Sequence, residues 1–250
     1  MPYGLYMSAE GAEAQSKRLD IIANNLANVE TVGFKRELAI LQAREAEAIE
    51  EGLDMIDSGS INQVGGGIML SETKTDFSHG PLQRTNIPKD VAIKGEGFFM
   101  VAKGDETLLT RAGNFDINSQ GNLVTQQGYE VLSDSGAPIV VSREAGPWQI
   151  TEEGFLQQAG ISQNLALVMP NSLGDLVKVG ENLFKPLSDP QAVSLEDRRV
   201  AAGYLEMSTS EPTTEMIAMI EASRMLEANV NMMKTQDQML GSLVNRVLKP

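Results

Sequence analysis

The one histidine of the chain, His79, is the first residue to consider for catalysis. It lies in residues 76–81 (DFSHGP), beside a serine and an aspartate, which are the side-chain types of a nucleophilic triad. A triad is defined by the geometry of three hydrogen-bonded side chains, and a histidine in a Gly-Pro turn supplies little of that. We interpret His79 as a turn residue. A hydrolase that uses His79 is the rival hypothesis, and its test is the activity of a His79→Ala variant.

Three further patterns resemble sites of known chemistry. Residues 95–97 (GEG) start like a dinucleotide-binding loop, but the third glycine is missing and a strand-like run follows. Residues 116–121 (DINSQG) resemble half of a calcium loop, but Gln127 stands where a bidentate glutamate is needed. Glu152 and Glu153 are neighbours, which point to opposite faces of a strand. We expect turns and solvated loops here, and no catalytic residue, metal or cofactor.

Composition excludes several classes of protein. The 250 residues include no cysteine, which excludes disulfides, thiolate zinc sites and cysteine nucleophiles. The formal net charge is −14, and phosphates need Lys or Arg to neutralise them, so we expect no nucleic-acid partner. The longest apolar runs, such as 165–169 and 216–220, have five residues. A membrane-spanning helix needs about 20, so we expect a chain that does not span a membrane.

The first residues do not resemble a cleavable signal peptide. No Lys or Arg precedes Lys17, and Glu10 and Glu13 interrupt any apolar region that such a peptide needs. If the protein leaves the cytoplasm, we expect it to be exported by a route that does not depend on a cleaved leader.

Both ends of the chain have the pattern of amphipathic helices. Residues 4–29 lack proline, and six of their eight heptad a and d positions are apolar. We expect Gly33 to stop this helix, because glycine readily takes the left-handed conformation. Residues 215–247 contain only Gly241 as a possible break, and eight of ten a and d positions are apolar. Such a helix is about 50 Å long and needs a partner to cover its apolar seam.

The middle of the chain has a different pattern. All but four of the 23 glycines lie between residues 52 and 203, among short runs of β-branched and aromatic residues. Residues 45–53 are compatible with a helix, while 58–60 and 65–67 read as flexible linker. The expected strands are residues 91–93, 98–101, 122–125, 139–141 and 165–168.

The predicted fold class is therefore α+β. The amino- and carboxyl-terminal helices are expected to form a coiled-coil pair, within one chain or with neighbours, around an all-β middle domain. The predicted divisions are an amino-terminal helix and signature, a linker or extended region, a β-rich domain and a carboxyl-terminal helix. Their residues are 1–36, 37–88, 89–203 and 204–250.

Several segments resemble those of the flagellar rod, hook and hook-associated axial proteins. Residues 23–35 (ANNLANVETVGFK) closely resemble the amino-terminal signature of that family. Residues 203–206 (GYLE), followed by 215–221 (EMIAMIE), are similar to its carboxyl-terminal signature. The segments that resemble its middle domain are residues 90–99 (DVAIKGEGFF), 110–115 and 121–125. The resemblance covers nearly the whole chain.

Within that family the rod proteins fit best, because the chain is too short for a typical hook protein. Residues 76–82, the compact middle and the methionine-rich end resemble the proximal rod subunit with a β domain. The distal rod subunit or a hook-like axial subunit is the alternative. Residues 208–212 (STSEP) depart from the Ser-Asn-Val run that is usual in both rod types.

The resemblance implies a structural protein and not an enzyme. It implies passage through the flagellar type III export apparatus without a cleavable signal peptide. It also implies helical assembly in the periplasm, with other rod subunits and copies of the same chain. The product is a hollow shaft of the basal body that transmits torque and serves as the export channel. A soluble binding module, with its termini closed on each other as a monomeric hairpin, is the less favoured alternative.

The expected assembly interface includes both helical seams and the amino-terminal signature. The asparagines are expected to bond backbone groups or neighbouring chains, and the glycine to permit a chain reversal. We expect poor order in the termini before assembly, because burial at roughly 25 cal/mol per Å² must offset the ordering entropy. The expected residues are Leu5, Leu19, Ile22, Asn24, Asn25, Leu26, Asn28, Gly33, Phe34, Met216, Met219, Leu226, Val230 and Met233.

Overall fold

The chain folds into two compact units. The computed structural model describes residues 3–44, 65–142 and 145–247. Unit 1 comprises Met1–Ala27, Glu37–Asp76 and Ser210–Pro250, and unit 2 comprises Asn28–Arg36 and Phe77–Thr209. Each unit is therefore built from stretches that are far apart in the sequence.

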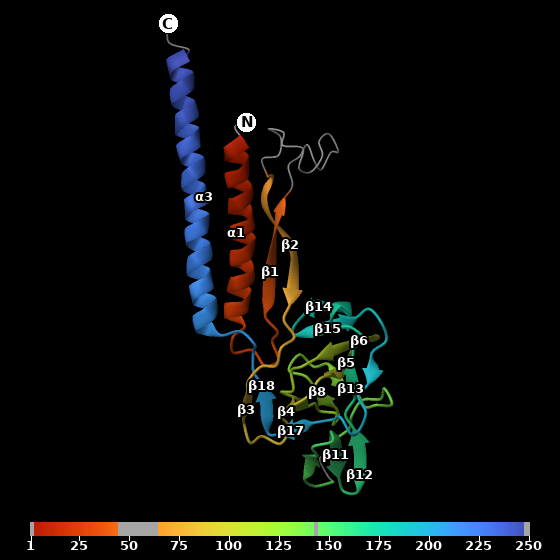
Figure 1. The fold of residues 1–250 in the computed structure, drawn as a ribbon. Coiled ribbons are helices and arrows are strands. Elements are labelled where there is room, and N and C mark those ends of the chain that lie inside the picture. Colours follow the sequence, from red (N-terminus) through yellow and green to blue (C-terminus); the bar gives the residue numbers. More distant parts are fainter. Residues whose placement is uncertain (1–2, 45–64, 143–144, 248–250) are drawn as a thin grey trace. The chain divides into compact units, whose positions relative to one another are not determined.

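Unit 1 contains the two terminal helices. Helix α1 spans Tyr3–Ala27 and helix α3 spans Pro212–Val247, and they run antiparallel, side by side (Figure 1). Pro212 begins α3, where its fixed φ fits the first turn and its missing N–H is not needed. Gly241 does not interrupt α3, so the 36 residues form one helix about 54 Å long.

The prediction that Gly33 ends the first helix is wrong. Helix α1 ends at Ala27, and the residues that follow form turns. Gly33 lies in unit 2 and has a φ of +68°. Its left-handed conformation therefore serves a turn of unit 2 and not the end of the helix.

A β-hairpin completes unit 1 within the region expected as a linker. Strand β1 spans Glu37–Arg44 and pairs antiparallel with β2, which spans Gly67–Thr75. Gly66 N donates to Arg44 O at 2.9 Å, so this glycine extends the hairpin and is not free linker. Helix α1 lies between α3 and the hairpin (Figure 1). The expectations for residues 45–53 and 58–60 lie outside the described residues.

Unit 2 is β-rich. A sheet of nine strands follows the order β14-β15-β6-β5-β9-β8-β7, with β13 paired to β5 and to β16. Smaller sheets join β10-β11-β12, β17-β4 and β18-β3. The strands are β3 Leu82–Arg84, β4 Val91–Ile93, β5 Phe98–Lys103, β6 Glu106–Thr110, β7 Asp116–Ile117, β8 Leu123–Val124, β9 Glu130–Val131, β10 Trp148–Ile150, β11 Phe155–Gln158, β12 Ile161–Asn164, β13 Leu167–Met169, β14 Leu176–Gly180, β15 Leu183–Pro186, β16 Gln191–Ala192, β17 Val200–Ala202 and β18 Tyr204–Glu206, with the short 3-10 helix η2 at Leu173–Asp175.

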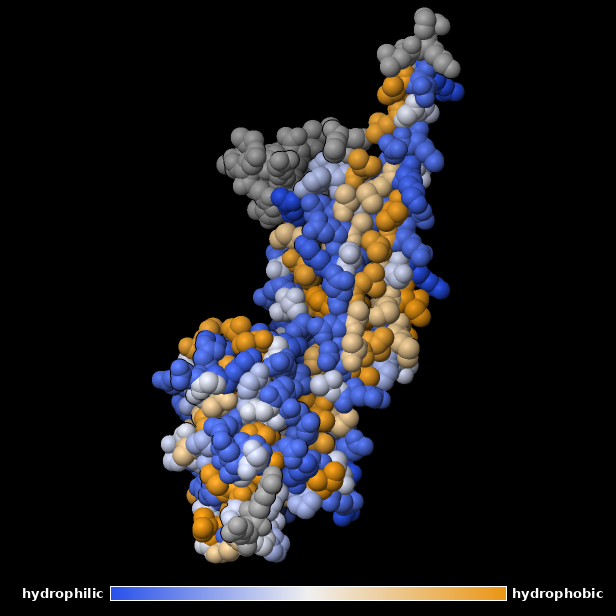
Figure 2. Space-filling model, turned by 180° about the vertical axis from the view of Figure 1, so that it is seen from behind, coloured by the Kyte–Doolittle hydropathy of each residue, from blue (hydrophilic) through white to orange (hydrophobic). Residues whose placement is uncertain are grey.

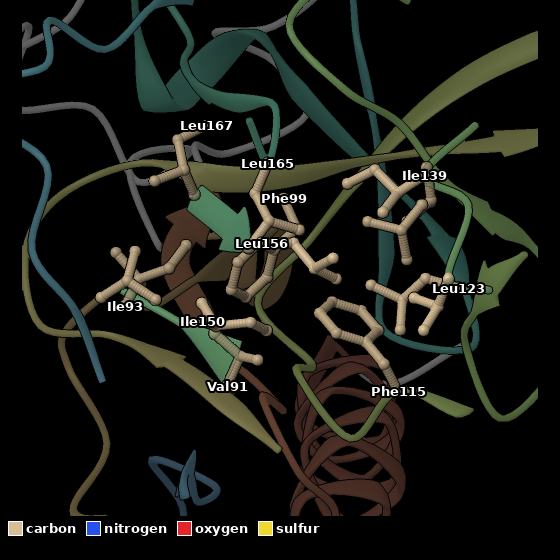
Figure 3. Packing of buried hydrophobic residues seen from close by; sticks show 14 of the residues in the cluster. Val91, Ile93, Phe99, Phe115, Leu123, Ile139, Ile150, Leu156, Leu165 and Leu167 are labelled. Carbon is tan, nitrogen blue, oxygen red and sulfur yellow. The ribbon is translucent and has the colours of Figure 1, made fainter. Parts of the chain in front are cut away.

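The central strands are covered on both faces because side chains alternate along a strand. Phe99 and Val101 of β5 join a large apolar cluster on one face, while Phe98 joins a smaller cluster on the other. Figure 3 shows the large cluster, in which Phe99 and Phe115 pack edge to face with ring centroids 5.2 Å apart. Burial on both faces makes β5 a nearly continuous apolar run in the sequence.

One expected strand does not form. Residues 139–141 have no named strand and contribute an isolated bridge, Asn122 to Val140. Ile139 and Val141 are nevertheless buried in the large cluster. The apolar pattern therefore indicated burial correctly, although the backbone of this segment forms only an isolated bridge.

Candidate assembly interface

Helices α1 and α3 approach closely where α1 carries glycines. A Cβ atom on Gly11 would lie 3.1 Å from the Asn229 side chain, and one on Gly4 would lie 2.9 Å from that of Gln236. The partners are seven residues apart on both helices and run in opposite directions, which sets the antiparallel register. Small residues on one helix let the backbones come together, so larger and polar side chains of α3 fill the gap.

The covered face of α3 repeats with heptad spacing. One row consists of Met219, Leu226 and Met233, all of which are half-buried and were expected on the seam. The second row lies one residue before the expected one, which contained Met216 and Val230. Its members are Glu215, Ala222, Asn229 and Gln236, of which the last two lie against the glycines of α1.

A large apolar surface of α3 is exposed among the residues that the structure describes. Met225, Met232 and Met239 recur every seven residues and are about half exposed, and they form a stripe beside the covered face. Figure 2 shows hydrophobic residues gathered along the length of the terminal helices. The other exposed large apolar residues of α3 are Met216, Ile217, Ile220, Leu240, Leu243 and Val244.

Helix α3 extends beyond the beginning of α1 (Figure 1). Gln236 lies opposite Gly4, one residue after the start of α1 at Tyr3, and α3 continues from there to Val247. Leu240 and Val244 continue the direction of the covered face by helical spacing, yet both are exposed. The apolar seam of α3 is thus longer than the helix that covers it. The stripe of Met225, Met232 and Met239 also makes the apolar surface wider than the covered face.

The expected apolar residues of α1 lie largely against their own chain. Ile22 is buried, and Leu5, Leu19 and Leu26 are half-buried. The hairpin contacts α1 through Gly67, where an added Cβ would lie 3.5 Å from the Cβ of Glu10. Residues on the hairpin that remain exposed and apolar are Leu38, Ile40, Ile68 and Met69.

Asn25 joins the end of α1 to the start of β1. Its Nδ2 donates to Glu37 O at 2.8 Å, and its Oδ1 accepts from Glu37 N at 2.9 Å. The side chain is 1% exposed. Asn24 is exposed, and Asn28 Oδ1 accepts from the Thr31 hydroxyl at 3.2 Å.

Gly33 and Phe34 are buried inside unit 2. Gly33 N donates to Glu206 O at 2.7 Å, and Phe34 is 2% exposed. The Lys178 ammonium lies 4.3 Å from the centre of the Phe34 ring, which is a favourable cation–π distance. These two residues of the amino-terminal signature therefore contact residues of the middle and carboxyl-terminal parts of the same chain.

Sequence reasoning missed a buried ion cluster next to Phe34. Lys35 Nζ contacts Glu206 Oε1 at 2.6 Å, and Arg111 contacts Glu206 Oε2 at 3.2 Å. Burial lowers the pKa of Arg111, and the charge of Glu206 acts against that shift. Lys35 and Glu206 stand in the two quoted signatures, but nothing in either segment shows that the two charges meet.

Of the patterns considered for chemistry, residues 118–121 form a turn after β7 and residues 151–154 form a turn before β11. His79 is exposed at the rim of a cavity of about 240 Å³ that Arg111 and Phe98 also line. Within the described ranges, no three His, Cys, Asp or Glu side chains are grouped so that they could hold a metal ion. The same part of the chain contains no helix with the length and apolar character that crossing a membrane requires.

Models of known families match the beginning, middle and end of the chain. Residues 5–35 match the model described as flagella basal body rod protein. Residues 92–158 match the D1 domain of flagellar hook protein FlgE/F/G, and residues 201–246 match the carboxyl-terminal part of flagellar basal body rod FlgEFG protein.

Individual relatives match over almost their full length. The flagellar basal-body rod protein FlgF of Caulobacter vibrioides is 31% identical over 250 residues, covering 100% of this chain and 99% of that protein. FlgG of Bacillus subtilis is 32% identical over 257 residues, and FlgG of Borreliella burgdorferi is 35% identical over 264. Each of these FlgG alignments covers 96% of this chain and 97% of the relative. The chain therefore belongs to the family of flagellar basal-body rod proteins.

Proposed function

We propose that this structural subunit of the flagellar basal-body rod assembles through the uncovered apolar surface of unit 1. Its role in the basal body is structural, and it assembles with other rod subunits. The helices α1 and α3 act as an antiparallel coiled-coil pair, and further helices of copies or related subunits extend that packing. Contacts that do not close on themselves build a helical, hollow shaft.

The observation that carries this proposal is the stripe of Met225, Met232 and Met239. Its heptad spacing matches that of the covered face beside it, so a second helix can pack there in the same way. Long, flexible methionine side chains adapt to partners that are similar but not identical. A rod built from several related subunits needs such a surface.

The expected details of export and position are part of the same proposal. The chain passes through the flagellar type III export apparatus and assembles in the periplasm, where the shaft transmits torque. We favour the proximal rod subunit with a β domain, with the distal subunit as the alternative. Identities of 31% to a FlgF and of 32% and 35% to two FlgG proteins are too similar to separate the named types.

The test is a double substitution on the stripe, Met225→Glu with Met232→Glu. Two charges at a helix–helix contact leave the free chain folded, because both side chains are half exposed, but they block packing of a partner helix. We expect strains with this variant to lose complete rods and swimming. The free energy of unfolding of the purified variant should stay within about 0.5 kcal/mol of that of the unsubstituted chain, as is usual for surface changes.

The matched control places the same two charges on the polar side of α3. Asn231→Glu with Gln238→Glu adds two glutamates at exposed positions that are again seven residues apart. This variant should assemble rods and swim normally. Normal swimming of the methionine variant would contradict the proposed interface.

A further inference from the structure

Three stretches of unit 2 lead directly into unit 1, and each has a residue in or bonded to one buried ion cluster: Lys35, Ser78 and Glu206. Their ends are Arg36, Phe77 and Thr209. Arg36 N donates to the Thr209 hydroxyl at 2.9 Å, and Thr209 N donates to Phe34 O at 3.1 Å. A force transmitted along the backbone from unit 1 enters unit 2 through connecting stretches such as these.

One carboxylate connects these stretches to each other and to the β core. Glu206 Oε1 accepts from Lys35 Nζ at 2.6 Å and from Gly80 N at 3.0 Å. Glu206 Oε2 accepts from Arg111 at 3.2 Å. Lys35 Nζ also donates to Ser78 O at 2.6 Å, so the first and second stretches are joined twice.

The cluster is anchored in the apolar core through Arg111. The Arg111 guanidinium lies 5.1 Å from the centre of the Phe98 ring. Phe98 in turn contacts Phe184 with ring centroids 5.9 Å apart, within the smaller apolar cluster. The Lys35, Glu206 and Arg111 side chains are 1%, 1% and 4% exposed, so water does not compete for their contacts.

The backbone of the returning stretch is held by two short ladders and by single hydrogen bonds such as those from Gly203 N to Asp90 O and from Met207 N to Pro81 O. It is paired through β17 with β4 and through β18 with β3, and each ladder has three residue pairs. When a strand is pulled from one end, the hydrogen bonds of a short ladder break one after another, starting at that end. Glu206 is the last residue of β18, and its side chain bonds three other segments at once.

Stability is a poor reason to bury three charges. The desolvation of a buried ion pair offsets much of its attraction, and apolar side chains of similar size often serve a fold equally well. Charged hydrogen bonds differ from apolar contacts in direction and in strength, so they fix the register of the segments that they join.

We propose that the cluster of Lys35, Glu206 and Arg111 is a mechanical joint. It locks the connecting stretches to the β core, so that a pull or twist arriving along one stretch is shared by all of them. The joint rests on the proposed function, because torque reaches the chain only if it is part of the rod.

The first test uses the purified full-length chain with Lys35→Met, Arg111→Met and Glu206→Leu combined. The readout is amide hydrogen exchange at Gly33, Met207 and Thr209. These amides donate to backbone oxygens of residues 206, 81 and 34, which the substitutions leave in place. We expect exchange at the three amides to be at least about tenfold faster, because local opening no longer requires the ion contacts to break. The melting temperature should change by less than about 3 °C.

A matched control breaks another ion pair of unit 2. Arg198 donates to both oxygens of Asp134 at 3.0 Å, and the Arg198 side chain is 3% exposed. Arg198→Met with Asp134→Leu should leave exchange at the three amides unchanged. Unchanged exchange in the triple variant overturns the joint. So does loss of protection throughout unit 2 or failure to fold, because the cluster would then serve overall stability.

The second test measures rotation in cells. Strains with the triple variant should build rods in normal number but lose swimming speed as the viscosity of the medium rises. Normal speed at every viscosity, or missing rods, overturns the joint. If deletion of the whole chain leaves rods complete, the proposed function fails, while the exchange measurement still decides whether the cluster locks the stretches.

Discussion

Gly33 is a residue whose backbone conformation and surroundings both exclude a side chain. Its φ is +68°, and a Cβ atom there would lie 2.4 Å from Ala112 N. We expect Gly33→Ala to destabilise unit 2 by more than about 2 kcal/mol, the sum of left-handed strain and the displacement of a buried backbone. The measurement is thermal unfolding of the purified chain followed by near-ultraviolet circular dichroism.

Gly104 supplies the control for that experiment. Its φ is +64°, but nothing lies within 4 Å of an added Cβ. Gly104→Ala therefore carries the backbone strain without the clash, and should cost about 1–2 kcal/mol. Equal losses at the two positions would show that the close approach of Gly33 to Ala112 is unimportant.

Asn25 is expected to matter more than its neighbour Asn24. Asn25→Ala leaves the partly buried N–H and C=O groups of Glu37 without the partner they have now, at a cost of about 1–3 kcal/mol. Asn24 is exposed, so Asn24→Ala should change the stability of unit 1 by less than half as much. Chemical denaturation of the two variants, followed by the helical signal, compares them. A larger loss for Asn24 would be inconsistent with this assignment.

At the scale of elements, glycines in the two helices have opposite roles. Gly11 permits the close approach of α3, so Gly11→Val should destabilise the helix pair by about 1–3 kcal/mol through overpacking. Nothing lies within 4 Å of a Cβ on Gly241, and Gly241→Ala should stabilise α3 by about 0.5–1 kcal/mol. Helical circular dichroism against temperature measures both. The same sign of effect for the two variants would refute this distinction.

The shifted seam of α3 has a physical cause at the same scale. A heptad pattern identifies the apolar side of a helix, but the row that touches a partner depends on the partner's size. Here the glycines of α1 bring Asn229 and Gln236 to the contact, and the apolar Met225 and Met232 remain exposed. Periodicity therefore predicts that a seam exists and does not by itself predict which chain covers it.

At the scale of the whole molecule, we expect the two units to unfold separately. Both apolar core clusters consist of residues of unit 2, whereas much of α3 is exposed. Calorimetry of the full chain should show two transitions, with unit 1 unfolding at the lower temperature. Phe115→Ala should reduce the stability of unit 2 by about 3–5 kcal/mol. It should therefore lower the temperature of the upper transition and leave the lower one unchanged. A single transition that shifts with both Phe115→Ala and Gly11→Val would show that the units are coupled.

Both units are discontinuous in sequence, and the predicted divisions were continuous segments. The expected boundaries near residues 36 and 203 assume that neighbours in sequence share a domain. In the structure, residues 28–36 belong to the β-rich unit, and the hairpin of residues 37–76 belongs to the helical one. Local composition cannot show this, because the assignment depends on contacts outside each segment, such as those of Gly67 with Glu10 and of Gly33 with Glu206.

The sequence alone determined the two terminal helices, the β-rich middle and the family. These follow from periodicity, glycine and proline placement and two distinctive segments, all of which act over a few neighbouring residues. Only the tertiary structure decided which face of α3 is covered, how the hairpin packs on α1 and that Lys35 meets Glu206. Such contacts join distant residues through shape and charge, and neither can be deduced from a pattern along the chain.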